Sequence, residues 1–380
     1  MKKILQITTI DMTTYCFHLP FLEFLRKRGF GVYAAFTEGK FTPLIQEKGV
    51  VTFNIPIERG ISPVKDFISF LKLYSLIKKE KFDIVHTATS KAGFIGRAAA
   101  HFARTPVVIH TSHELPQNST QNPVLKFFYR CLEKIASGWT DKLITVSNPN
   151  VEQILKEKIA PREKIYLVPN GIETEKFDIR VDKNIKIERA KGSSPLQNIP
   201  SDSKIIGAVG RLEKVKGHKY LMEAASLVVK DFPNAVFYII GEGHLKDYLI
   251  KEINKRGLQK NVILGGFCKN LPETLNALDI FVSASLYEGF GVAIAEAMAC
   301  GLPVITTGVG GVTDFAIDGE TALVVPPRDA NALYEAIIFM LKNPDKASFY
   351  AENAKEKIKN EFSREQMIEK LWDIYGEILT

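Results

Sequence analysis

Residues 285–301 read SLYEGFGVAIAEAMACG, a glycine-rich turn followed by a run of small residues. The apolar run Ile280–Ser283 before it predicts a buried strand, and the small residues after it predict a helix. The turn Gly289–Gly291 opens backbone N–H groups to a ligand, because Gly has no Cβ, and N–H groups at a helix start attract anions. We expect Glu288 in the loop and Glu296 about two turns inside the helix, so one ligand could touch both. The alternative is an ordinary amphipathic helix with one exposed Glu.

A second strand-to-helix loop carries two cations. It lies in GAVGRLEKVKGH, residues 207–218, between the apolar run Ile205–Val209 and a helical pattern that begins at Gly217. Ligands of α/β sheets bind at such loops. Arg211, as a planar fork, and Lys216, as a point charge, could converge on a diphosphate. Basic loop residues are often simply solvated, but the glutamate pair further along the chain favours the diphosphate.

Strands and helices alternate outward from these loops. Helical patterns such as Phe17–Arg28, Val64–Lys79, Ala92–Phe102 and Val124–Ser137 lie between most strands, which indicates parallel sheets with helices on both faces. Charged residues and then Gly, Ser and Pro mark a linker between Asp178 and Ser203. The expected strands are Ile4–Thr8, Val32–Ala35, Val51–Ile55, Ile84–His86, Val107–Thr111, Leu143–Val146 and Ile165–Val168 before the linker, and Ile205–Val209, Ala235–Ile240, Val262–Leu264, Ile280–Ser283, Val304–Thr306 and Leu323–Val325 after it.

Length and composition are those of a soluble two-domain protein. The chain has 380 residues, of which 46% are apolar and 24% charged. No apolar run approaches the roughly 18 residues of a transmembrane helix, and the N-terminus enters a strand directly instead of forming a signal peptide. Four scattered cysteines indicate reduced core thiols, not a zinc site or a disulfide framework. We therefore expect a cytoplasmic protein.

The positive charge is concentrated in the first half of the chain. The net charge is +7, and the whole excess lies before residue 176. A basic half attracts phosphorylated lipid, a membrane surface or nucleic acid. Nucleic acid is disfavoured because the lysines are dispersed and not clustered with stacking aromatics. An anionic membrane surface or a lipid diphosphate fits better.

With both loops in view, the chain resembles the retaining glycosyltransferases of the GT4 type, which have the GT-B fold. The resemblance covers essentially the whole chain. Three N-terminal segments, Thr8–Asp11, His86–Arg97 and Val107–His113, look like bacterial enzymes that extend lipid-linked saccharides for capsule, O-antigen or glycoprotein glycans. The resemblance implies two doubly wound Rossmann-like domains facing a cleft, with residues 1–177 binding the acceptor, 178–203 as linker, 204–362 binding the nucleotide-sugar, and 363–380 as a helix that crosses back to the first domain.

The resemblance also implies roles for individual residues. Glu296 would bind the ribose hydroxyls of the donor, Glu288 would contact hydroxyls of the transferred sugar, and His113 would lie near the reacting centre. Where related sequences have Gly after that His, this chain has Glu114. From residues alone, a His at a strand end is more often a hydrogen-bonded loop residue. Backbone groups at Gly289, Phe290 and Gly291 would hold sugar and phosphate, and Gly266 and Phe267 would flank the base.

No metal or other cofactor is expected. The sequence contains no Asp-x-Asp, the motif with which many glycosyltransferases hold a divalent metal. Arg211, Lys216 and backbone N–H groups could neutralise the leaving diphosphate instead, as preorganised electrostatic stabilisation. No carboxylate can be assigned as a covalent nucleophile of the kind that retaining glycosidases use.

The acceptor side is less distinct. The segment Thr9–Thr14 has no glycine, unlike the Gly-Gly loop of many GT4 enzymes, so Thr13 or Thr14 could contact the donor phosphate, or the loop could close only when acceptor binds. Lys91 and Arg97 could bind an acceptor diphosphate, or Arg97 could form a salt bridge on its helix. The helices Val64–Phe82 and Leu125–Ile135 could touch a membrane, or each could be a core-facing helix with a solvated basic face.

The sequence thus predicts a glycosyltransferase that moves a hexose or N-acetylhexosamine from a UDP-sugar to a polyprenyl-diphosphate saccharide, at the cytoplasmic face of a membrane. Two alternatives remain open. One is a catalytically silent GT-B protein that acts as a binding or assembly partner. The other is a nucleotide-sugar epimerase on the same fold, which would need no acceptor.

Overall fold

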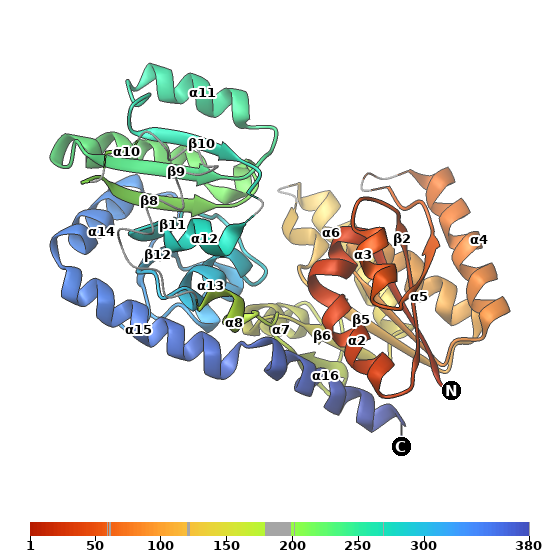
Figure 1. The fold of residues 1–380 in the computed structure, drawn as a ribbon. Coiled ribbons are helices and arrows are strands. Elements are labelled where there is room, and N and C mark those ends of the chain that lie inside the picture. The colour runs from red at the N-terminus through yellow and green to blue at the C-terminus, as the bar shows by residue number, and fades with distance from the viewer. Residues whose placement is uncertain are drawn as a thin grey trace. The chain divides into compact units, whose positions relative to one another are not determined.

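Every strand predicted from the apolar runs is present in the computed structural model, within two residues at each end. The structure describes the chain except residues 59, 61, 120, 121, 179–198, 201, 269 and 380. The chain forms two units, which we call unit 1 (Met1–Gly171 with Glu365–Thr380) and unit 2 (Ile172–Arg364). Each unit contains one parallel sheet with helices packed on it (Figure 1).

Unit 1 has a seven-stranded sheet in the order β3-β2-β1-β4-β5-β6-β7. Its strands are β1 (Lys3–Ile10), β2 (Gly31–Thr37), β3 (Val51–Asn54), β4 (Ile84–Ala88), β5 (Val107–Ser112), β6 (Lys142–Thr145) and β7 (Ile165–Leu167). Its helices are α1 (Asp11–Thr13), the π-helical turn η1 (Thr14–His18), α2 (Leu19–Lys27), α3 (Thr42–Glu47), α4 (Pro63–Glu80), α5 (Ser90–Ala103), η2 (Pro116–Ser119), α6 (Pro123–Gly138), α7 (Asn148–Lys156), η3 (Arg162–Lys164) and α16 (Arg364–Leu379).

Both faces of this sheet are buried, as the continuous apolar strands predict. Successive side chains of β1 point to opposite faces, so Ile4 packs with α2 and α16 while Leu5 packs with α4 and α5. From α16, Leu371 and Tyr375 enter the first of these cores. The last helix is therefore an integral part of unit 1.

Unit 2 has a six-stranded sheet in the order β10-β9-β8-β11-β12-β13. Its strands are β8 (Lys204–Val209), β9 (Ala235–Ile240), β10 (Val262–Gly266), β11 (Ile280–Ser283), β12 (Val304–Thr307) and β13 (Leu323–Val325). Its helices are α8 (Thr174–Phe177), η5 (Lys214–Lys216), α10 (His218–Asp231), α11 (Lys246–Lys255), α12 (Leu271–Asn276), α13 (Val292–Ala299), η6 (Gly310–Asp314), α14 (Ala330–Lys342) and α15 (Pro344–Glu361).

Each sheet reverses its strand order at one place. In unit 1 the reversal lies between β1 and β4, and in unit 2 between β8 and β11. Ligands of doubly wound sheets bind outside the carboxyl ends of the strands at this point. Both glutamates of the Ser285–Gly301 stretch and both cations of the earlier loop follow strands at the reversal in unit 2.

The segment after β1 is not the loop that we predicted for Thr9–Thr14. The chain enters α1 at Asp11 and continues through η1 into α2. The buried Asp11 carboxylate accepts hydrogen bonds from the N–H groups of Met12 (2.7 Å), Phe41 (2.8 Å) and Thr42 (3.0 Å). These bonds fix the start of the helix, and two of them come from residues far along the chain.

The cysteines form no disulfide, but the prediction of core thiols was wrong, because Cys16 is exposed and the other three are half-buried. The boundary between the units falls at Gly171, where the next residue, Ile172, joins unit 2 by backbone hydrogen bonds with Phe362 and Arg364. Most of the predicted linker, 178–203, lies outside the described residues.

Candidate active site

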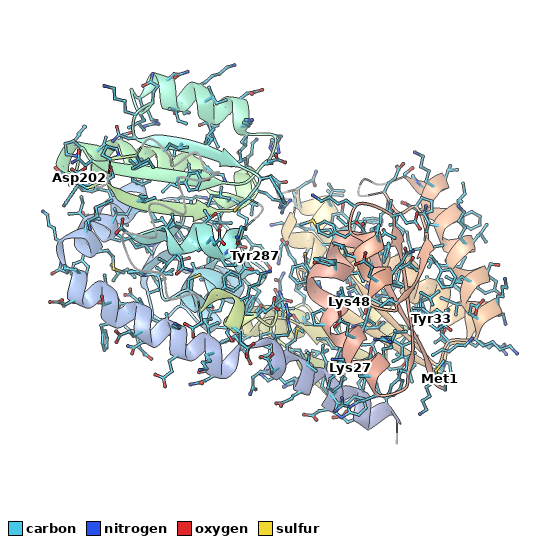
Figure 2. The ribbon with its side chains drawn as sticks, viewed as in Figure 1. Met1, Lys27, Tyr33, Lys48, Asp202 and Tyr287 are labelled. Atoms are coloured by element: carbon cyan, nitrogen blue, oxygen red, sulfur yellow. The ribbon has the colours of Figure 1, made fainter. Side chains whose placement is uncertain are left out.

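Backbone hydrogen bonds join three loops at the carboxyl edge of the unit 2 sheet. The N–H of Leu286, after β11, donates to the carbonyl of Val215, after β8 (2.7 Å). The N–H of Gly311, after β12, donates to the carbonyl of Glu288 (3.0 Å). Figure 2 labels Tyr287, which lies between these two contacts. The loops after β8, β11 and β12 therefore form one connected surface.

Glu288 and Lys216, predicted from separate motifs, meet on this surface. Lys216 Nζ lies 2.5 Å from Glu288 Oε1, and the Ser285 hydroxyl donates to the same oxygen at 2.7 Å. Both charged side chains are more than four-fifths buried. An ion pair with an added hydroxyl holds the ammonium in a fixed place, which is what a preorganised anion site needs.

Two glycines make this arrangement possible. Gly310 lies so close to the Glu288 backbone that a Cβ there would come within 1.9 Å of the Glu288 carbonyl oxygen. Gly291 takes a φ of +96° immediately before α13, in the left-handed region that side chains disfavour. The first allows the loops to touch, and the second turns the chain into the helix.

Arg211 does not share the partner of Lys216. Its exposed guanidinium pairs with Glu213 at 2.7 Å, while its carbonyl accepts a hydrogen bond from the His218 ring at 3.1 Å. The predicted convergence of the two cations is therefore absent from this structure: Lys216 is fixed at Glu288, whereas the exposed Arg211 guanidinium pairs with Glu213.

Glu296 lies four residues after the start of α13, hence about one turn inside the helix and not the two that we expected. Burial raises the pKa of its carboxyl to about 7, partly opposed by the positive charge of Lys176 on α8. The side chain is only half-buried, so it remains reachable. Near neutral pH this carboxyl can either accept or donate a hydrogen bond.

The remaining predicted donor residues divide into backbone and side-chain candidates. Phe290 is buried and packs against Phe315 and Phe362, with ring centroids 5.2 and 5.8 Å away, so its ring belongs to the core. Phe267, just after β10, is instead an exposed aromatic ring. Gly266 before it accepts a hydrogen bond from the N–H of Gly241 (2.8 Å).

In unit 1, His113 lies in a histidine cluster that sequence reasoning did not find. His113 follows β5, and its Nε2 lies 3.5 Å from Nε2 of His18, the last residue of η1. His86 on β4 contacts His18 ring to ring at 5.9 Å and bonds to Tyr375 (2.9 Å) and Thr111 (2.8 Å). A π-helical turn shifts side chains off ordinary helical spacing, so periodicity alone could not place His18 here.

The histidines of this cluster are neutral over the physiological pH range. Burial lowers the pKa of His113 to about 4 and that of His86 to about 3. Burial, together with the neighbouring histidines, also lowers the pKa of His18 well below its usual value. Each ring therefore offers one donor and one acceptor nitrogen, not a positive charge.

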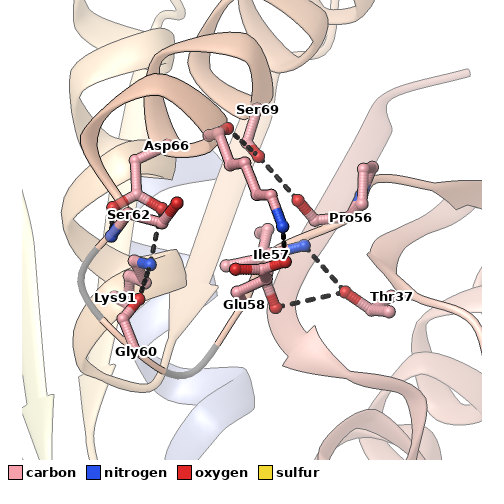
Figure 3. A network of polar contacts seen from close by, with 10 residues as sticks. Thr37, Pro56, Ile57, Glu58, Gly60, Ser62, Asp66, Ser69 and Lys91 are labelled. Carbon is pink, nitrogen blue, oxygen red and sulfur yellow. Dashed lines mark hydrogen bonds and ion pairs between the residues drawn. The ribbon is translucent and has the colours of Figure 1, made fainter.

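The four predicted acceptor-side residues have different environments. Thr14 is buried, with its hydroxyl 2.8 Å from that of Thr8, whereas Thr13 is half-buried at the end of α1. Lys91 contacts Asp66 at 2.5 Å and the carbonyl of Gly60 (Figure 3). Arg97 is fully buried and forms a salt bridge, but with Glu133 on α6 and not on its own helix α5 as the second alternative had it.

The described part of the chain has neither a cluster of metal ligands nor a membrane-spanning helix. There, no three or more His, Cys, Asp or Glu side chains are grouped so as to hold a metal ion. No helix among the described residues is both long and apolar enough to cross a bilayer. The metal-independence expected from the sequence stays a prediction.

Comparison with known proteins gives concordant matches in both halves of the chain. Residues 20–176 match the model of Glycosyltransferase Family 4, and residues 193–357 match that of Glycosyl transferases group 1. The chain is 34% identical over 338 residues to a UDP-Gal:alpha-D-GlcNAc-diphosphoundecaprenol alpha-1,3-galactosyltransferase of Escherichia coli, covering 88% of this chain and 85% of that protein. It is 31% identical to the capsular polysaccharide biosynthesis glycosyltransferase CapM of Staphylococcus aureus, covering 94% and 93%.

The fold has close structural counterparts. The crystal structure of Anabaena Alr3699/HepE in complex with UDP and glucose superposes with a TM-score of 0.84, covering 99% of this chain and 100% of that one at 17% identity. Two Rossmann-like parallel sheets in tandem are the GT-B fold that the sequence predicted.

Proposed function

The chain belongs to the family 4 glycosyltransferases, and we propose that it transfers a hexosyl or N-acetylhexosaminyl group from a UDP-sugar to a polyprenyl-diphosphate-linked saccharide, with retention of anomeric configuration. The observation that carries the proposal is the Lys216–Glu288–Ser285 cluster at the strand reversal of unit 2. The choice of UDP follows the galactosyltransferase of E. coli, whose name specifies a UDP-linked donor.

Transfer breaks the bond between the anomeric carbon and a phosphate oxygen of the donor. The bonding electrons stay on that oxygen, so negative charge grows on the diphosphate and positive charge on the sugar. Lys216, already fixed in place, would stabilise the diphosphate electrostatically. Arg211 is exposed and lies close to Lys216 in the sequence. A rotation of its side chain would bring its planar guanidinium to the phosphate oxygens of the same diphosphate. These cations take the place of a metal, so we propose metal-independent transfer.

The carboxyls would bind hydroxyl groups. Glu288 has one oxygen engaged by Lys216 and Ser285, which leaves Oε2 as an acceptor for a sugar hydroxyl. Glu296, one turn inside α13, would bind the ribose, since a carboxylate can accept from two vicinal hydroxyls. The exposed ring of Phe267 would flank the base. His113, neutral in its cluster, would donate a hydrogen bond to the transferred sugar.

The acceptor class follows the relatives. Two of them carry undecaprenol in their names: the E. coli galactosyltransferase, and an N-acetylgalactosaminyltransferase of Campylobacter jejuni at 27% identity. A lipid-linked acceptor places the enzyme at the cytoplasmic face of a membrane, where the basic excess of unit 1 would attract anionic lipid.

The test is transfer by the whole chain in EDTA, with UDP-, GDP- and ADP-sugars and a synthetic lipid-diphosphate N-acetylhexosamine as acceptor. We expect one UDP-sugar to be used, with an α-linked product from an α-linked donor by NMR. Product formed from donor without acceptor would indicate the epimerase instead. Nucleotide binding without turnover on any acceptor would indicate the silent partner, and loss of activity in EDTA that Mg²⁺ restores would refute metal-independence.

A further inference from the structure

Two helices of unit 1 expose apolar side chains where a globular protein would bury them. In α6, residues 123–128 are all exposed, including Phe127 and Phe128, while the buried positions hold Glu133, Ala136 and Ser137. In α4, Phe67 is 61% exposed, and Val64, Ile68 and Leu71 are exposed too. Of the two alternatives for these helices, the core-facing helix with a solvated basic face does not fit the first half of either one. Exposed apolar surface of this extent marks an interaction site.

A cavity of about 650 Å³ lies between these two helices. Phe67 and Phe70 from α4 form one wall, Phe128 and Leu132 from α6 form another, and Phe94 and Ala98 from α5 form the floor. The volume falls in the range of roughly 300–1,000 Å³ that is typical of small-molecule pockets. A flat membrane surface or another folded protein does not require a cavity, whereas a single apolar chain fills one.

The pocket has a polar end. Ser90 and Lys91 come from the first turn of α5, Thr9 from the end of β1, and all three line the pocket together with the apolar residues of the next two turns. The first turn of α5 lies at the carboxyl edge of the unit 1 sheet, the same edge at which His113 follows β5. A ligand in the pocket would therefore have its apolar part along α5 and its polar part toward the histidine cluster.

The two helices beside the pocket carry more cations than acids. The helices α4 and α6 carry the cations Lys72, Lys78, Lys79, Lys126, Arg130 and Lys134, besides Lys65, which pairs with Glu58 at 2.5 Å. Their only acids, Asp66, Glu80 and Glu133, are each paired with a cation from elsewhere: Lys91 (2.5 Å), Lys3 (3.5 Å) and Arg97 (2.9 Å). The two helices thus carry an excess of positive charge beside an apolar cavity, and a diphosphate at Lys91 would replace the Asp66 carboxylate as its partner.

We propose that this pocket holds the first isoprene units of a polyprenyl diphosphate, with the diphosphate at the Ser90–Lys91 end; the choice of lipid rests on the proposed function. Apolar walls match the isoprenoid chain, the lysines match its charge, and the direction of α5 presents the saccharide to the edge of the sheet where His113 lies. The exposed apolar residues beyond the pocket would contact the rest of the isoprenoid as it continues into the bilayer.

The test is calorimetric binding of farnesyl diphosphate to the full chain, compared with inorganic diphosphate. The variants are Phe67→Ser and Phe128→Ser, singly and together; both residues line the pocket yet are 61% and 48% exposed, so the fold should survive, and circular dichroism checks this. The control is Phe349→Ser on α15, where the ring is 54% exposed and far along the chain in unit 2. We expect one saturable site, weakened at least about tenfold in the double variant and unchanged in Phe349→Ser.

Three results would overturn the inference. Equal affinity for farnesyl diphosphate and inorganic diphosphate would mean that the pocket does not bind the isoprenoid part of the ligand. Farnesyl binding that survives the double variant, while binding to phosphatidylglycerol vesicles is lost, would mean that the face docks on a bilayer. If the protein self-associates, the double variant abolishes this self-association and farnesyl diphosphate does not bind, then the face docks on a second copy of this chain. Because this assay needs no turnover, the inference can fail while transfer to a lipid-linked acceptor stands, and the reverse also holds.

Discussion

Replacing Arg97 by Met should be among the most destabilising single changes in unit 1. Arg97 is fully buried, and its Nη2 lies 2.9 and 3.1 Å from the two oxygens of Glu133, whose side chain is 6% exposed. At about 3 Å the attraction is roughly 5 kcal/mol for an effective dielectric constant near 20. Removing one partner leaves the other charge buried alone, which costs about 3–5 kcal/mol.

The double variant Arg97→Met/Glu133→Leu should recover most of that loss. An apolar pair of similar volume avoids the cost of desolvating two charges, and it can match or exceed a buried ion pair in stability. The Arg97 side chain carries an added cost of its own, since its Nη1 is buried and has no hydrogen-bond partner within the described residues. If adding Glu133→Leu to Arg97→Met raises the free energy of unfolding, the loss in the single variant comes from the unpaired charge of Glu133. A simple loss of packing would instead make the double variant less stable still.

The assay is urea unfolding followed by tryptophan fluorescence. Both tryptophans of the chain, Trp139 and Trp372, belong to unit 1, so the signal reports on that unit alone. The control is Lys48→Met, which removes an exposed ion pair with Glu23 in the same unit and should cost at most about 1 kcal/mol. If Arg97→Met costs no more than Lys48→Met, or if the double variant is less stable than the single one, the reasoning is refuted.

Three further predictions concern the two sites. Lys216→Met should lower kcat about 10²–10³-fold, as loss of one preorganised donor to a developing anion does, and removing Glu288 as well should add little; an unchanged kcat would exclude Lys216 from the reaction. Donor binding should strengthen up to about tenfold from pH 6 to 8 as Glu296, with a pKa of about 7, ionises, and Glu296→Gln should abolish that dependence in calorimetry. Unit 1 should lose stability as pH falls below about 6.5, because its neutral histidines bind protons only when unfolded. His113→Gln should reduce this slope by up to about 1.4 kcal/mol per pH unit between pH 6 and 4.5, and an unaltered slope would contradict the pKa assigned to His113.

The strands were predictable because burial on both faces leaves continuous apolar runs, and no distant residue is needed to recognise them. The pairing of Lys216 with Glu288 was half predictable: each motif pointed to a ligand, but only the sheet order brings their two loops together. The helix after β1 was not predictable, since the N–H groups that fix Asp11 come from Phe41 and Thr42. Likewise, only the position of α6 shows that Glu133 is the partner of Arg97.

The exposure of the first half of α6 could not be predicted from the sequence, for a different reason. An apolar stripe on a helix predicts that something covers it, but the sequence does not say whether the cover is the same chain. Here residues 123–128 of α6 are exposed among the described residues of unit 1, and the cavity beside them depends on the positions of α4 and α5.

The return of α16 to unit 1 also governs how the protein emerges from the ribosome. The first 171 residues of unit 1 are synthesised before unit 2, but Leu371 and Tyr375 of its core are synthesised only after unit 2. Translation of the intervening unit takes on the order of 10–40 s at ~5–20 residues per second. During that interval the core face formed by α2 and the sheet stays open, with His86 lacking the Tyr375 hydroxyl that it bonds in the finished fold. The nascent chain should therefore bind chaperones through this face until α16 has been synthesised, and unit 2 should reach its native state first.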